Sequence, residues 1–192
     1  LHLFDLALNE RAVSRLPLSL PVTALASGTA DGPGLRVLAR VPGEVTARFT
    51  GEKIEYVAIV FADKDDIRDI RRGEADARSG RGRAVVFGAS AGRGPGDYTC
   101  RVVVRDMDTG LSAVGSTKAA VRAPAAQGLR LWTPLLLAEE PGTARVEAAA
   151  GKGRTTVPWD EIYAYDRTRY SPAAGSVSKL AARLLAVVPY FV

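Results

Sequence analysis

The stretch that decides the fold runs from residue 96 to residue 105 and reads Gly96-Asp97-Tyr98-Thr99-Cys100-Arg101-Val102-Val103-Val104-Arg105. Tyr98, Cys100, Val102 and Val104 occupy every second position, while Arg101 and Arg105 fall between them. This alternation predicts a β-strand with one face on a core, because successive side chains of a strand point to opposite faces. Asp108-Thr109-Gly110 follows as a hairpin signal, so we expect 111–121 to return as the paired strand.

Short apolar runs between turn signals continue toward the N-terminus. Strands are expected at 22–26, 35–41, 44–50, 53–62 and 84–87, with a flexible loop over 88–96. The polar segment 63–77 is either a short helix or a twisted edge strand. With 19 glycines and 11 prolines among 192 residues, the chain is rich in turn-forming residues. We therefore expect a lead-in segment over 1–16 and a β-sandwich over 17–123.

The C-terminal third has a different pattern. Residues 124–128 read as a linker, 129–138 are strongly apolar, and 145–149 form a weak strand pattern. Residues 180–192 fit a strand or a buried helix, and their valines and aromatics favour the strand. We expect 124–192 to be a linker and a second small or incomplete β-rich unit.

The pair Tyr98 and Cys100 has the spacing found at the start of strand F in immunoglobulin-like sandwiches, where the tyrosine hydroxyl bonds back to the backbone. Cys100 is the single cysteine, so no disulfide joins the two sheets, and no tryptophan lies in 53–62. An antibody-type domain is therefore excluded. The predicted fold class is all-β, an immunoglobulin/fibronectin-like antiparallel β-sandwich with a smaller C-terminal β-rich extension.

Several motifs in 85–190 resemble one family. They are Pro95-Gly96-Asp97-Tyr98, the run from Arg101 to Asp106, Thr109-Gly110, Gly115-Ser116, the apolar segment 129–138 and the segment 165–172. Together they are similar to the region C-terminal to the von Willebrand A-like domain in large exported bacterial proteins described as VWFA-related. No Asp-x-Ser-x-Ser occurs in the chain, so the metal-dependent adhesion site of the A-like domain is not carried over. The resemblance implies an extracytoplasmic scaffold that lies in the periplasm, on the cell surface or outside the cell. Because the chain begins at Leu1, we expect an excised domain or a mature fragment.

Two short motifs raise the question of catalysis. Gly88-Ala89-Ser90-Ala91-Gly92 matches the nucleophile elbow of serine hydrolases, but further glycines follow and His2 is the single histidine. Ser176-Val177-Ser178-Lys179 matches S-x-x-K without the partner motifs of penicillin-recognising enzymes. Cys100 reads as a buried small apolar residue. We expect no enzyme and no cofactor, with a serine hydrolase using Ser90 as a remote alternative.

Charged clusters suggest a metal ion or nucleic acid, and both have a simpler explanation. Asp63, Asp65, Asp66 and Asp69 form one acidic group, and Asp106 with Asp108 forms another. Neither matches a calcium loop, and solvated turns explain them. Arg78, Arg81, Arg83 and Arg93 alternate with glycines, but stacking aromatics are absent from the segment. Despite a net charge of +5, we expect neither a metal site nor nucleic-acid binding.

Aromatic residues in the C-terminal third are the candidate interaction surface. They are Trp132, Trp159, Tyr163, Tyr165 and Tyr170. The expected function is a non-catalytic structural or protein-interaction module that binds a protein partner or a neighbouring domain of its own chain. The alternative is a carbohydrate or cell-wall binding module, which requires an exposed coplanar pair among these rings. No uncharged apolar run reaches the length of a membrane span, and the sequence leaves the oligomeric state open.

Overall fold

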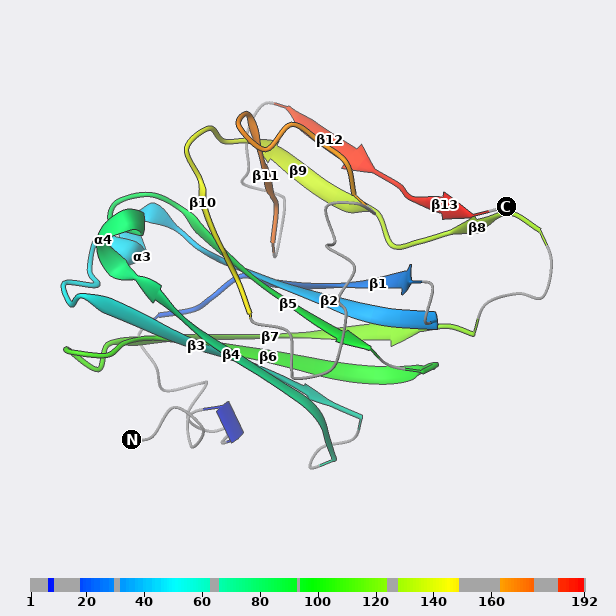
Figure 1. Cartoon of the computed structure of the whole chain (residues 1–192), viewed down its shortest axis with the longest axis horizontal. Helices are drawn as coiled ribbons and strands as arrows, with labels where there is room; N and C mark the ends of the chain where they lie inside the picture. The colour runs from blue at the N-terminus through cyan, green and yellow to red at the C-terminus, as the bar shows by residue number, and fades with distance from the viewer. Residues whose placement is uncertain are drawn as a thin grey trace.

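Two four-stranded sheets pack face to face in the computed structural model, which describes residues 7–8, 18–29, 32–62, 66–92, 94–123, 128–148, 163–174 and 183–191 (Figure 1). The first sheet has the order β1 (Val22–Thr29), β2 (Gly32–Val41), β5 (Val85–Gly92) and β10 (Ala144–Glu147). The second has the order β4 (Ile67–Asp76), β3 (Lys53–Phe61), β6 (Gly96–Asp106) and β7 (Ser112–Val121). Neighbouring strands are antiparallel except β10 and β5, which are parallel. The predicted all-β antiparallel sandwich is confirmed.

The core between the sheets follows the alternation read from the sequence. Tyr98, Cys100, Val102 and Val104 of β6 all join it. Across the core, the rings of Tyr56 and Phe87 lie with centroids 4.7 Å apart. The Tyr98 hydroxyl donates a hydrogen bond to the carbonyl oxygen of Gly94, 2.9 Å away, which is the contact that defines a tyrosine corner.

Two local predictions are wrong. Residues 44–50 do not form a strand, because α3 (Gly43–Thr46) turns the chain there. Val45 lies in α3 and Phe49 follows the turn after it; both are buried, while Ala47 between them is exposed. The expected loop over 88–96 is strand as far as Gly92, because Ala89 and Ala91 both point into the core.

Within the polar segment 63–77, the described residues 67–76 form an edge strand. β4 pairs with β3 on one side and forms the edge of the second sheet, with a register irregularity at Val60/Phe61. A second short helix, α4 (Ala77–Gly80), follows it, capped by the Asp76 carboxylate, which accepts a hydrogen bond from the Arg78 N–H.

Both outer faces of the sandwich are partly covered by other parts of the chain. On the second sheet, Ala7 packs with Val57, Ile59 and Val103. Arg101, expected to face solvent, is 6% exposed there and donates a hydrogen bond to the Ala7 carbonyl oxygen at 2.6 Å. Alternation within one strand identifies the face of a side chain, but it does not reveal a further layer over that face. Ala7 and Leu8 are helical, and the rest of 1–16 lies outside the described residues.

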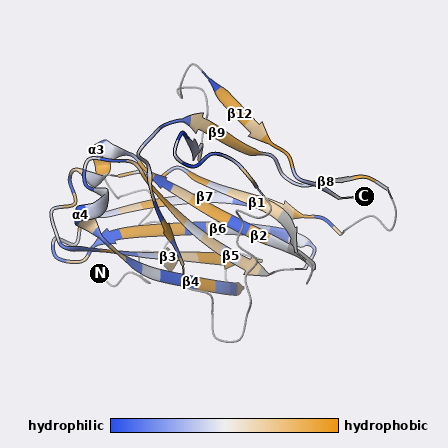
Figure 2. Ribbon diagram, turned by 45° about the horizontal axis from the view of Figure 1, so that its top comes forward, coloured by the Kyte–Doolittle hydropathy of each residue, from blue (hydrophilic) through white to orange (hydrophobic). Residues whose placement is uncertain are grey.

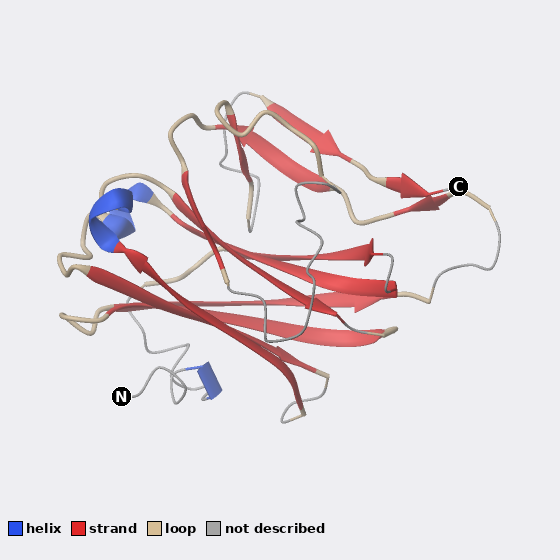
Figure 3. Ribbon diagram, viewed as in Figure 1, coloured by secondary structure: helices blue, strands red, loops and turns tan. Residues whose placement is uncertain are grey.

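The C-terminal part adds a small layer over the outer face of the first sheet (Figure 3). Its strands are β8 (Arg130–Leu131), β9 (Leu135–Glu139), β11 (Tyr170–Pro172), β12 (Leu184–Val187) and β13 (Tyr190–Phe191). β9 pairs with β11 and β12, and β8 pairs with β13. The strand reading of 180–192 is therefore confirmed over β12 and β13. No helix among the described residues is long and apolar enough to cross a membrane.

This layer shares both a core and a sheet with the sandwich. Leu135, Leu137 and Tyr163 pack against the outer-face residues of the first sheet in one buried cluster, which includes Leu25, Leu38 and Val86. β10 leaves the layer and extends the first sheet beside β5. Residues on both sides of the expected boundary at 123/124 therefore contribute to the same structural unit.

Candidate functional site

The aromatic residues expected at a contact surface are mostly structural. Tyr163 is fully buried, its hydroxyl donates to the Thr133 carbonyl oxygen at 2.8 Å, and burial raises its pKa to about 12. Tyr165 lies half-buried with the Arg145 guanidinium 5.1 Å above its ring centroid. Tyr170 lies under Arg169 in the same manner.

Trp132 is half-buried, and its backbone N–H donates to the Pro189 carbonyl oxygen at 3.0 Å. Its indole Nε1 is buried and has no hydrogen-bond partner among the described residues. Trp159 lies outside those residues. The rings that the structure describes therefore do not form one exposed aromatic surface.

Ion pairs hold the C-terminal layer on the first sheet. Arg36 of β2 is 4% exposed, pairs with Glu147 of β10, and donates to the Ser90 hydroxyl at 2.8 Å. Arg40 pairs in the same way with Glu140. Gly88 leaves the space for the first pair, because a Cβ there would collide with the Arg36 guanidinium. Arg36 and Arg40 of β2 therefore pair with residues of the C-terminal part of the chain instead of facing solvent.

Neither nucleophile candidate has the geometry that catalysis requires. Ser90 lies within the extended strand β5 and not on the strand-to-helix turn that defines a nucleophile elbow. Cys100 is fully buried, and burial raises its pKa to about 12. A thiolate nucleophile needs a lowered pKa and access to solvent. The S-x-x-K motif at 176–179 lies outside the described residues.

Asp106 organises the β6–β7 turn. Its carboxylate accepts hydrogen bonds from the backbone N–H groups of Gly51, Asp108 and Thr109 at 2.9, 3.0 and 3.1 Å. Burial alone would raise its pKa, but these donors outweigh burial and lower the pKa below its usual value. Asp106 is thus occupied by N–H donors and not arranged as a cation ligand.

The described residues of the acidic cluster 63–69 also pair with basic side chains. Asp69 pairs with Arg71 at 3.1 Å, and Asp63 and Asp65 lie outside the described residues. Within the described part of the chain, no group of three or more His, Cys, Asp or Glu side chains is placed to hold a metal ion.

The arginine-rich segment is tied to its own fold. The Arg81 guanidinium donates to three backbone carbonyl oxygens, those of Phe49, Thr50 and Gly51. Arg78 pairs with Glu52, and Arg93 lies outside the described residues.

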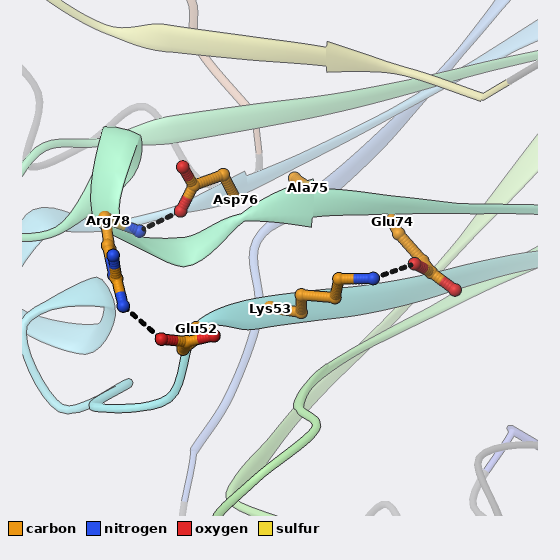
Figure 4. Close-up of a pocket in the computed structure, with 6 residues that line it drawn as sticks. All are labelled: Glu52, Lys53, Glu74, Ala75, Asp76 and Arg78. Carbon is orange, nitrogen blue, oxygen red and sulfur yellow. Dashed lines mark hydrogen bonds and ion pairs between the residues drawn. The ribbon is translucent and has the colours of Figure 1, made fainter.

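The pocket beside this segment is shallow and charged (Figure 4). Its lining residues are Glu52, Lys53, Glu74, Ala75, Asp76 and Arg78. Figure 4 shows Arg78 paired with Glu52, Lys53 paired with Glu74, and the Asp76 carboxylate accepting from the Arg78 backbone N–H. Because the acidic and basic side chains of this pocket pair with one another, the pocket presents no surface of a single charge sign that would attract a charged ligand.

One surface that the sequence interpretation missed is apolar. We define the C-terminal ribbon as residues 129–139 and 184–191, which contain β8 and β9 with their antiparallel partners β13 and β12. Its exposed large apolar side chains, between 41% and 66% exposed, are Leu129, Leu131, Leu184, Leu185, Val188 and Tyr190. Leu131 lies directly opposite Tyr190. The uninterrupted apolar run 184–188 was the signal available in the sequence. A strand that is covered on only one face alternates apolar and polar residues, and this run does not.

The outer edge of the ribbon, residues 184–191, differs in its chemistry from the charged β4 edge. No described strand pairs with β12 on the side away from β9, and 184–191 contain no charged residue. The β4 edge, by contrast, carries Arg68, Asp69, Arg71, Arg72, Glu74 and Asp76. The β7 edge is partly covered by a bridge from Ser19 to Val114. Figure 2 shows this contrast between a hydrophobic β12 and a largely hydrophilic β4.

No protein-family model matches the chain, and neither a curated protein nor a solved structure matches it. The proposed function therefore depends on the geometry of the ribbon and on the sequence resemblance.

Proposed function

We propose that this chain is a non-catalytic interaction module of an exported bacterial protein, and that the C-terminal ribbon is its contact surface. The single observation that carries the proposal is the concentration of exposed apolar side chains on the ribbon. The largest contiguous apolar patch on a monomeric protein is often functional, and larger patches mark interaction sites. The expected partner is a protein or a neighbouring domain of the same chain.

The ribbon offers two kinds of contact to such a partner. Leu131 and Tyr190 form an exposed cross-strand pair, and aromatic and leucine side chains supply large contact areas in protein interfaces. The open edge of β12 presents backbone N–H and C=O groups to which an extended segment can add as a further strand. Hydrogen bonds along the edge and apolar contacts beside it together define a β-augmentation site.

An immunoglobulin-like class for the sandwich agrees with this role. The order β4-β3-β6-β7 facing β1-β2-β5 and the Tyr98 to Gly94 hydrogen bond support that class. The resemblance of 85–190 to regions that follow von Willebrand A-like domains supports an extracytoplasmic location. Sandwiches of this class host many functions, so the ribbon and not the fold carries the proposal.

Carbohydrate binding is the weaker candidate. It would require an exposed coplanar pair of rings, but Tyr163 is buried and Tyr165 lies beneath Arg145. No specific observation favours it over protein binding.

A capture experiment with matched variants tests the proposal. The chain would be immobilised and exposed to a cell-envelope extract, alongside the double variant Leu131→Ser/Tyr190→Ser and the control Met107→Ser, since Met107 is 42% exposed away from the ribbon. We expect one protein to be retained by the wild type and the control and lost with the double variant. Retention that is equal for all three proteins would refute the ribbon as the contact surface.

A further inference from the structure

We propose that the outer edge of the ribbon pairs with the same edge of a second copy of this chain, antiparallel about a two-fold axis. This inference rests on the proposed function, because it names the partner of the same surface. Pairing would join β11-β9-β12 to its symmetry mate and create one continuous sheet of six strands across the dimer. A two-fold axis of this kind is the commonest symmetry of homo-oligomers.

The backbone of the edge is available for pairing. β12 is bonded to β9 on one side only among the described residues. Leu184 and Leu185 are consecutive, so their side chains point to opposite faces, yet they are 47% and 41% exposed. Both faces of β12 are therefore open at Leu184 and Leu185. The apolar side chains of these two residues could cover both faces of a strand that adds beside β12.

The chemistry of the edge suits a copy of itself. Residues 184–191 read Leu-Leu-Ala-Val-Val-Pro-Tyr-Phe, so no antiparallel register within this segment brings two like charges together. Proteins discourage edge pairing with charged side chains, and β4 carries such charges whereas β12 does not. Pro189 has no N–H to donate, and its carbonyl oxygen already accepts a hydrogen bond from the backbone N–H of Trp132. The pairing would therefore use the other residues of the edge.

The exposed apolar side chains of the ribbon supply more than half of the area that a standard dimer interface buries. With roughly 150 Å² for a large apolar side chain, the exposed fractions of the six ribbon residues give roughly 500 Å² per copy. A standard interface buries about 800 Å² per partner. The edge backbone and the exposed Ala186 side chain supply part of the remainder.

Sedimentation of the wild-type chain across a concentration series tests the proposal. We expect the mass to rise from one copy to two, and Leu184→Lys to raise the dimer dissociation constant by at least about tenfold. Ile70→Lys is the matched control, because Ile70 is a 40% exposed residue on the edge strand β4, and we expect no change. A monomer at every concentration, or a dimer that Leu184→Lys leaves intact, would overturn the inference.

Crosslinking locates the contact independently of affinity. Cys100 is fully buried, so an introduced Ala186→Cys is the single accessible thiol of that variant. We expect disulfide-linked dimers of Ala186→Cys under mild oxidation, at least about tenfold faster than for Met107→Cys. Equal rates would overturn the inference. A chain that stays monomeric yet captures an envelope protein through Leu131 and Tyr190 would overturn the second copy alone and leave the proposed function standing.

Discussion

Replacing Leu137 with alanine should destabilise the sandwich as well as the C-terminal layer. Leu137 is fully buried on β9 and belongs to the cluster that includes Leu25, Leu38 and Val86 on the outer face of the first sheet. Leucine-to-alanine changes at such positions cost about 3 kcal/mol, because a cavity adds to the lost transfer free energy. For a chain of this length, we expect the melting temperature to fall by about 6–12 °C.

The two tryptophans make the assay specific. Trp132 and Trp159 both follow residue 124, so tryptophan fluorescence reports on the C-terminal part, while far-UV circular dichroism reports mainly on the sandwich strands. We expect the two signals to give coincident urea transitions in the wild type, and both to shift together in Leu137→Ala. Met107→Ala is the control, since its side chain is 42% exposed outside the ribbon and should cost no more than about 0.5 kcal/mol.

A fluorescence transition that moves alone in Leu137→Ala, with the circular dichroism transition unchanged, would refute the reasoning. It would mean that the layer unfolds as an independent unit and that its contacts with the sandwich contribute little to stability.

Three further predictions follow from single residues. Asp106 has a lowered pKa in the folded state, so its stabilising effect is present above the unfolded pKa of about 4 and is lost as the pH falls through the folded value. Asp106→Asn should therefore lower the free energy of unfolding in urea by about 1–3 kcal/mol at pH 7. The difference in this free energy from wild type should shrink below pH 4. An equal difference at both pH values would contradict this. Gly115→Ala should cost about 1–3 kcal/mol, because its Cβ would collide with the Leu20 carbonyl oxygen, and an unchanged melting temperature would disprove the close contact. Cys100 should react with a thiol reagent only after denaturation, because burial raises its pKa to about 12, and rapid reaction of the native protein would show that the thiol is open.

The sandwich could be predicted because its strands obey a local rule. The alternation around Tyr98 and Cys100 depends only on the two-residue period of a strand, and every second residue of β3 from Ile54 to Val60 and of β6 from Tyr98 to Val104 joins the core between the sheets. α3 was missed because Val45 and Phe49 satisfy both a two-residue and a four-residue spacing. Local periodicity does not distinguish those two cases.

Contacts between distant segments were not predictable from the sequence pattern. Arg36 reads as a solvent-facing residue of an alternating strand, and its burial depends on Glu147, more than a hundred residues away. The aromatic cluster near Tyr163 was an ambiguous signal, since a large ring is equally suited to a core and to an interface. The ribbon became visible only when the exposure of its leucines was known.

Backbone amide hydrogen exchange tests the central claim, that the ribbon is the contact surface, most directly. Exchange would be compared at low and high protein concentration, and with and without the protein captured from the envelope extract. We predict slower exchange over 184–191 on association, with little change at β4. Slower exchange confined to β4 or to the loops of the sandwich, with 184–191 unchanged, would contradict the claim.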